Sequence, residues 1–293
     1  MNGKVFSKLI FQYYGIELSA KQKTWFAGDG KELRGTILKG HTRGESIVQF
    51  VRHADRSVLC EGFFTGRKES EVPALRDLLQ DEGVAGQKFT MDALHFKPKT
   101  LREIVCAGGQ FVVHLKNNQK ELYQEMVFCS TSRSPVYEQN LQEKGHGRLE
   151  RRHYRTYKVD GLYIDERWDD IKFQTLIVVE RQREIVNTGQ YSSQTDYYLS
   201  NIPTKNMQTA EELFAAIRNH WQVEVNNHLR DCTLKEDATR CTDVGTARIM
   251  ASSRTLVIKI LQKSEAKNKR ALLDNFADNF DQCIQWLKKI NFL

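Results

Sequence analysis

The sequence has 293 residues, of which 40% are hydrophobic and 28% are charged. A chain of this length and composition buries one large core or two modest ones, which excludes a disordered protein. No apolar run is long enough for a membrane span, and the start lacks the apolar core and cleavage site of a signal peptide. We therefore expect a cytoplasmic protein with no membrane partner, and the net charge of +7 favours a polyanionic partner.

Strands and helices alternate in the first half of the chain. The predicted elements are a strand at Thr24–Ala27, two strands within Ser46–Phe64 that form a hairpin around His53–Arg56, a helix at Glu71–Asp81, a strand at Lys88–Met91, a helix at Lys99–Ala107 and a strand at Phe111–Leu115. This order predicts a mixed α/β layout around one sheet.

The second half of the chain begins with strand-like runs and ends with helices. Residues 147–201 hold three such runs, which we interpret as a β-rich insertion. A long helical pattern starts at Thr209 and continues to Arg240, and two further amphipathic helices are predicted at about 245–290. We find no repeats or linkers. The chain therefore divides into a short N-terminal segment at 1–23 and one domain at 24–293. The six cysteines form no CxxC pair, which favours reduced thiols.

Glu224 interrupts the apolar stripe of the long helical pattern. At about 100° per residue, this carboxylate lies between Trp221 and Val225 on the apolar side. A buried carboxylate is costly unless it is paired or binds a metal ion. Pairing with a buried arginine or a flanking histidine is therefore one interpretation, and a metal site is the other.

Two aspartates can join Glu224. Asp29 and Asp92 each follow a short predicted strand, where a central sheet would bring them together. The sequence separations are 92 − 29 = 63 and 224 − 92 = 132 residues, so the second gap contains the β-rich insertion. Carboxylate oxygens suit Mg²⁺ or Mn²⁺. Two such ions about 3.5–4 Å apart support phosphodiester cleavage.

Other motifs could indicate a zinc site or a nucleotide-binding loop, but they match those sites less well than the three acids match a magnesium site. His220, Glu224 and His228 at i, i+4 and i+8 could form one edge of a zinc site, which needs a further ligand. The segment GDGKELRG has neither the glycine spacing of a dinucleotide fingerprint nor the lysine of a phosphate loop.

Five short motifs resemble a known family. DGKELRGT, MDALHFK, VVHLKNNQKEL, HGRLERRHY and HWQVEVNNHLRDCTLKEDATR occur in the order found in DDE transposases of bacterial insertion sequences. The similarity is greatest to the H-repeat-associated subgroup. It implies a ribonuclease-H-like fold in which Asp29, Asp92 and Glu224 are the catalytic acids and hold two Mg²⁺ (or Mn²⁺) ions.

The resemblance also implies a function and partners. The protein would cleave double-stranded DNA at the ends of an insertion sequence, transfer the strand to target DNA, assemble on DNA as a homodimer and associate with the nucleoid. A non-catalytic DNA-binding remnant and a nuclease outside transposition are the alternatives.

The sequence departs from the family pattern at two places. Related transposases carry Y-x2-R-x3-E around the glutamate, and here Ile217 and His220 occupy the tyrosine and arginine positions. Only 28 residues precede Asp29, whereas the subgroup has a longer helical region there. We therefore expect that a DNA-recognition region is truncated.

A basic segment fits a DNA partner. Residues 144–158 hold six Lys or Arg residues against one acid, and an extended strand would show this charge on both faces. Phosphate contact is one interpretation, and a solvated ribbon without a ligand is the other. The predicted DNA-binding residues, including three from the motif HLKNNQ, are Lys116, Asn118, Gln119, Arg148, Arg151, Arg152, Arg155 and His220.

Overall fold

A computed structural model describes residues 3–19, 21–66, 70–81, 83–145 and 147–292. The chain forms two compact units, each made of segments that are distant in the sequence. The first unit comprises residues 1–17, 29–78 and 221–293, and the second comprises residues 18–28 and 79–220. Strand β1 (Trp25–Glu32) contributes its first four residues to the second unit and its last four to the first.

The first unit contains the predicted hairpin. Strands β2 (Glu45–Arg52) and β3 (Val58–Thr65) are antiparallel, and the strand order is β3-β2-β1. Seven of the eight β2 residues are buried, which agrees with their β-branched and aromatic composition. The turn includes Arg56 at a φ of 61°, so both the strands and the turn are confirmed. Helix α2 (Glu71–Leu79) follows, two residues shorter than predicted.

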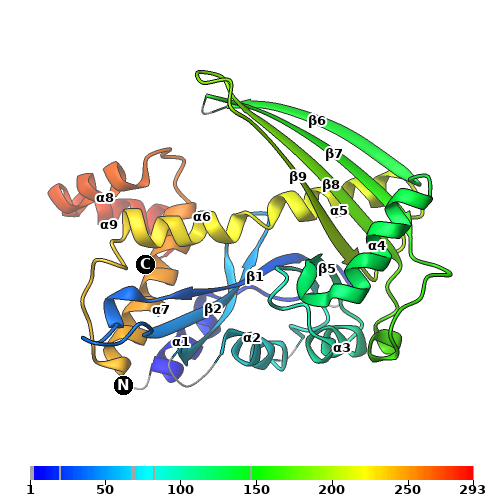
Figure 1. The fold of residues 1–293 in the computed structure, drawn as a ribbon. Coiled ribbons are helices and arrows are strands. Elements are labelled where there is room, and N and C mark those ends of the chain that lie inside the picture. Colours follow the sequence, from blue (N-terminus) through cyan, green and yellow to red (C-terminus); the bar gives the residue numbers. More distant parts are fainter. Residues whose placement is uncertain (1–2, 20, 67–69, 82, 146, 293) are drawn as a thin grey trace. The chain divides into compact units, whose positions relative to one another are not determined.

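Helices α1 (Gly3–Tyr14) and α7 (Val244–Gln262) pack against each other in this unit (Figure 1). Both contact β3, and Ala251 of α7 joins a core cluster with Leu33, Ile47 and Phe63. Helix α1 turns Ser7 and Ile10 inward, while the side chain of Tyr13 is 76% exposed. Residues Gly3–Tyr14 therefore form one helix that packs on the first unit.

The C-terminal part differs from the prediction. The final helical pattern is split into α8 (Lys269–Asp278) and α9 (Phe280–Lys289), because Asn279 has φ −132° and ψ 73° and leaves the helical region. The rings of Phe276 in α8 and Trp286 in α9 pack against each other, with their centroids 5.1 Å apart. The described part of this region therefore holds three helices, α7, α8 and α9, where the sequence predicts two.

The second unit is built on a mixed sheet. Its strand order is β1-β4-β5-β9-β8-β7-β6, with β4 (Lys88–Met91) and β5 (Gln110–Leu115) parallel to β1. The other strands, β6 (Tyr137–Gly145), β7 (Arg148–Lys158), β8 (Thr175–Ile185) and β9 (Tyr191–Ser200), are antiparallel to their neighbours. Figure 1 shows these last four as long ribbons that lie side by side. The predicted mixed α/β class is confirmed, with a sheet that is mostly antiparallel.

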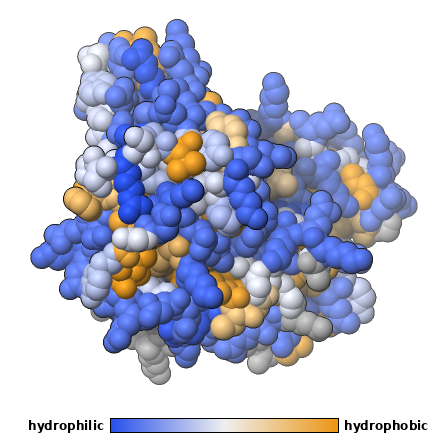
Figure 2. Space-filling view, turned by 90° about the vertical axis from the view of Figure 1, so that its right-hand side faces the viewer, coloured by the Kyte–Doolittle hydropathy of each residue, from blue (hydrophilic) through white to orange (hydrophobic). Residues whose placement is uncertain are grey.

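Three α-helices lie in the described part of this unit. Helix α3 (Pro98–Cys106) was predicted within one residue, whereas α4 (Lys120–Ser132) was not predicted. Helix α5 (Met207–Asn219) packs Leu213 and Phe214 into a cluster with Tyr154 and Ile177 of the antiparallel strands. The face in Figure 2 is mainly hydrophilic, with small separate hydrophobic patches.

The long helical pattern does not form one helix. Helix α5 ends at Asn219, α6 covers Gln222–His228, and a π-helical turn covers Leu229–Thr233. The apolar stripe also ends with α5, because the side chain of Trp221 is 55% exposed and Glu224 is exposed. The prediction that Glu224 is buried in an apolar stripe is therefore wrong.

Candidate active site

Asp29 lies on β1 directly after three buried residues, Phe26 to Gly28, and is itself half-buried. In the first unit, the Asn227 side chain donates a hydrogen bond from Nδ2 to Oδ2 of Asp29 over 3.3 Å. Asn227 belongs to α6, the helix that also carries Glu224. A hydrogen bond therefore links the strand of one predicted catalytic acid to the helix of another.

Glu224 has no hydrogen bond or ion pair with any described residue. Although the side chain is exposed, the surrounding protein raises the pKa of the carboxyl group by desolvation. The alternative in which an arginine or histidine neutralises Glu224 finds no support within the described part of the chain. The carboxylate is available to a ligand from solution.

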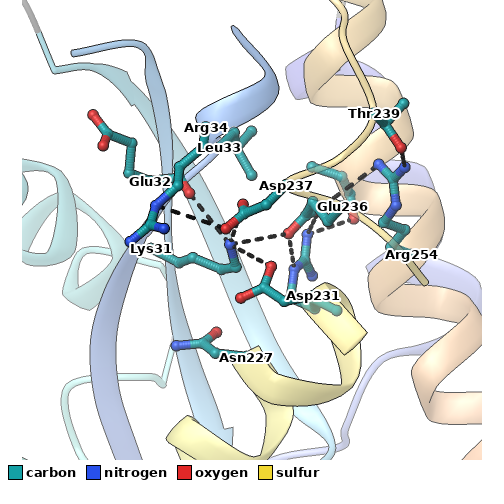
Figure 3. A network of polar contacts seen from close by, with 12 residues as sticks. Lys31, Glu32, Leu33, Arg34, Asn227, Asp231, Glu236, Asp237, Thr239 and Arg254 are labelled. Carbon is teal, nitrogen blue, oxygen red and sulfur yellow. Dashed lines mark hydrogen bonds and ion pairs between the residues drawn. The ribbon is translucent and has the colours of Figure 1, made fainter. Parts of the chain in front are cut away.

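Lys31 is the centre of an ion-pair network in the first unit (Figure 3). Its Nζ lies 2.8 Å from Oδ1 of Asp231 and 2.8 Å from Oδ1 of Asp237. Arg230 binds both carboxylate oxygens of Glu236, over 2.7 and 2.8 Å, and the Arg230 side chain is fully buried. No sequence pattern marked Lys31, although it lies two residues after Asp29 and therefore on the same face of the strand.

Asp92 lies in the second unit, directly after β4. Its Oδ1 accepts a hydrogen bond from the backbone N–H of Leu94 over 2.8 Å, and the side chain is half-buried. Asp92 also lines a cavity of about 50 Å³ with His114 and His220. This carboxylate therefore lines the same small cavity as two imidazoles.

His220 and His114 both have partners in the second unit. Nδ1 of His220 is hydrogen-bonded with Oγ1 of Thr90 at 3.0 Å, and burial lowers the pKa of the imidazole to about 4. His220 is therefore neutral at pH 7. The His114 ring stacks on Tyr198, and its Nε2 lies 3.2 Å from Oδ1 of Asp196.

The predicted DNA-binding arginines of β7 fall into two groups. Arg148 and Arg151 are exposed and have no hydrogen bond or ion pair with the described residues. Arg152 forms ion pairs with Glu143 and Glu150, and Arg155 forms one with Glu180. The first two guanidinium groups are thus open to phosphate, whereas the second two are engaged within the sheet.

The residues predicted from the motif HLKNNQ also differ in exposure. Lys116 is exposed. Asn118 donates from Nδ2 to the carbonyl oxygen of Ala93 over 2.8 Å, and the buried Gln119 donates from Nε2 to that of Phe96 over 3.0 Å. Both amides therefore hold the segment that follows β4, close in the sequence to Asp92.

Asp29 and Glu224 belong to the first unit and Asp92 to the second, so the convergence of the three carboxylates stays a prediction. Over the residues that the structure describes, no three His, Cys, Asp or Glu side chains form a group able to hold a metal ion. The donor chemistry of the predicted set nevertheless fits Mg²⁺ or Mn²⁺, because all donors are carboxylate oxygens and Glu224 has no competing cation.

No helix in the described part of the chain combines the length and the apolarity that a membrane crossing needs. The described cysteines are all free thiols, as their spacing predicts.

Comparison with known proteins identifies the family of this chain. Residues 41–258 match the family described as "Transposase DDE domain", and the chain belongs to this family. Asp92 and Glu224 lie within the matched range, and Asp29 lies 12 residues before it, since 41 − 29 = 12.

Two relatives come from Escherichia coli (strain K12). They are "Putative protein YbfL" and "H repeat-associated putative transposase YhhI", and each is 28% identical to this chain over 250 residues. Each alignment covers 83% of this chain and 65% of the relative, so the chain spans less than two thirds of the length of these relatives. The predicted resemblance to the H-repeat-associated subgroup is confirmed.

Proposed function

We propose that the chain is a DNA transposase that cleaves a phosphodiester bond and transfers the freed strand, with Asp29, Asp92 and Glu224 as its catalytic acids. Membership of the DDE family supports this function. The observation that carries it is the parallel pairing of β1 with β4, whose last register pair is Gly28 with Met91. The next residue after each is an aspartate, and register partners in neighbouring strands are about 4.8 Å apart. Each of these paired strand segments is therefore followed directly by one of the proposed catalytic aspartates.

The fold supports the same proposal. The strand orders β3-β2-β1 in the first unit and β1-β4-β5 in the second, with parallel β1, β4 and β5, are those expected of a ribonuclease-H-like fold. In such a fold the antiparallel strands β6 to β9 would be the insertion before the glutamate helix. They begin at Tyr137, ten residues earlier than the sequence patterns indicate, since 147 − 137 = 10.

The carboxylates would hold two divalent cations, with which DDE transposases generally work. Bound there, the ions would supply the activation of water and the stabilisation of the leaving oxygen at the scissile phosphate. The protein itself holds Asp29 beside Asn227, keeps Glu224 without an internal cation, and fixes the loop of Asp92 through the Leu94 N–H. A fixed set of anionic oxygens costs little reorganisation when the ions and the DNA bind.

Double-stranded DNA is the proposed substrate, both as element end and as target. Arg148, Arg151 and Lys116 are the exposed cations of the predicted set, and they would contact phosphate without reading sequence. His220 is half-buried and neutral, so it would act by supporting the Asp92 cavity rather than by binding phosphate. Assembly as a homodimer on DNA belongs to the same proposal.

The test uses a donor plasmid that carries the gene with its flanking DNA. Wild-type protein with Mg²⁺ should cut this plasmid and join the cut ends to a second plasmid. Asp29→Ala, Asp92→Ala and Glu224→Ala should each abolish both products, whereas Asp278→Ala, an exposed acid of α8, should leave them unchanged. Cleavage without joining would identify a nuclease, and retained activity in any of the three variants would remove that residue from the site.

A further inference from the structure

The strand of Asp29 and the helix of Glu224 are joined by two consecutive contacts in the first unit. Asp29 and Lys31 are alternate residues of β1 and therefore share one face of the strand. Asn227 and Asp231 are four residues apart on α6 and the π-helical turn, and therefore share one side of the helical segment. Asn227 donates to Asp29 over 3.3 Å, and Lys31 contacts Asp231 over 2.8 Å.

The spacing of the two contacts matches on both elements. Two residues of a strand advance about 6.6 Å, and four residues of a helix advance about 6 Å. The distance from Asp29 to Lys31 along β1 is therefore about the same as the distance from Asn227 to Asp231 along the helical segment. The two contacts together define one register between these elements. Glu224 lies three residues before Asn227, which places it on the same side of α6 as that contact.

The second contact is anchored more deeply than the first. The Lys31 side chain is only 9% exposed, and its ammonium also lies 2.8 Å from Asp237. Glu236, next to Asp237, pairs with the buried Arg230, which in turn donates to the carbonyl oxygen of Ala251 in α7. Sliding α6 along β1 would leave these charges buried without partners, which is strongly unfavourable.

We propose that Asn227 and Lys31 are positioning residues that fix the register of α6 on β1, so that Asp29 and Glu224 are held together to bind a divalent cation. This inference rests on the proposed function. Asn227 acts directly on the orientation of the Asp29 carboxylate, while Lys31 acts through the helical segment. Neither side chain supplies a ligand to the cation.

The test measures Mn²⁺ affinity of the full chain by electron paramagnetic resonance, without DNA, beside the Mg²⁺ dependence of plasmid cleavage. Asn227→Ala should weaken Mn²⁺ binding about tenfold and raise the Mg²⁺ concentration needed for half-maximal cleavage. Cleavage at saturating Mg²⁺ should stay within about threefold of wild type. His228→Ala, an exposed neighbour on α6, is the matched control and should change neither value.

Lys31→Met should weaken Mn²⁺ binding at least as much as Asn227→Ala does. Lys31→Arg keeps the positive charge and should therefore bind Mn²⁺ more tightly than Lys31→Met. Circular dichroism shows whether Lys31→Met folds. If it does not, the Mn²⁺ affinity of Asn227→Ala tests the inference by itself. The inference is overturned if folded Asn227→Ala binds Mn²⁺ like wild type while Asp29→Ala and Glu224→Ala lose binding. If wild type shows no binding that depends on Asp29 and Glu224, the proposed function itself fails, and the inference fails with it.

Discussion

Arg230 and Glu236 form a two-point ion pair in which the guanidinium group is fully buried, with distances of 2.7 and 2.8 Å. Arg230 also donates to Oγ1 of Thr255 over 2.9 Å. One side chain therefore joins the segment after α6 to helix α7. Because both charges are removed from water, the pair is tolerated only while both members are present.

Replacing Arg230 with methionine should lower the free energy of unfolding by about 3–5 kcal/mol, because Glu236 is left buried without its main partner. Urea denaturation followed by circular dichroism measures this change. The matched control is Arg270→Met, which removes an exposed ion pair with Asp274 and should cost less than about 1 kcal/mol. The double variant Arg230→Met/Glu236→Leu should be more stable than Arg230→Met. Equal stability of the two would show that the buried charge is not the cause.

The losses caused by removing the proposed catalytic acids should not add. Asp29→Ala and Glu224→Ala should each reduce the cleavage rate to background, and the double variant should be no slower, because the acids act as one metal-holding set. Binding of DNA should persist or increase slightly, since negative charge near phosphate is removed. A double variant much slower than either single variant would indicate independent roles.

Replacing both Arg148 and Arg151 with glutamine should weaken binding to all double-stranded DNA sequences about equally. The slope of log affinity against log salt should fall by about 1.8, because two phosphate contacts are lost. Fluorescence anisotropy at several salt concentrations measures both effects. Arg152→Gln/Arg155→Gln is the control, since these guanidinium groups are engaged with carboxylates, and its slope should change less. An unchanged slope for Arg148→Gln/Arg151→Gln would exclude this part of β7 from the DNA interface.

His220 should make the stability of the protein depend on pH. Burial lowers the pKa of His220 in the folded state to about 4, whereas the unfolded value is 6.5. The unfolded chain therefore binds a proton first as the pH falls. Keeping His220 neutral in the fold therefore contributes to the free energy of unfolding. This contribution is fully present above pH 6.5 and is lost between pH 6.5 and 4, by up to about 3 kcal/mol.

The variant His220→Asn separates this effect from the other titrating groups. Urea unfolding at several pH values should show a smaller loss of stability on acidification for this variant than for wild type, because its amide does not titrate. The same pH dependence in both proteins would show that His220 is not the responsible group.

The sequence correctly predicted those helices and strands whose apolar residues recur with a clear helical or strand period. The hairpin of β2 and β3, strand β4 and helix α3 were predicted within a few residues. Strand β6 was not, because its sequence YEQNLQEKG is polar on both faces and most of its residues are exposed. Helix α4 was missed because its apolar residues do not form a distinct stripe.

The candidate site was predicted in its residue types but not in its local environment. The helical pattern through Glu224 gave no sign that α5 ends at Asn219, so the burial of Glu224 was overestimated. Lys31 was missed because its partners Asp231 and Asp237 are 200 and 206 residues away, since 231 − 31 = 200 and 237 − 31 = 206. Periodicity describes neighbours along the chain, and such distant pairs become visible only once the fold is known.

The buried carboxylate of Glu61 bears on the order in which the two units fold during synthesis. It accepts hydrogen bonds from Ser7, Gln49, Ser252 and Thr255. Thr255 is 194 residues further along the chain, which at about 5–20 residues per second leaves the ribosome about 10–40 s after Glu61. When residue 220 has been made, residues 79–220 are complete while the first unit still lacks α7. The inserted unit can therefore fold on the ribosome before the unit that encloses it.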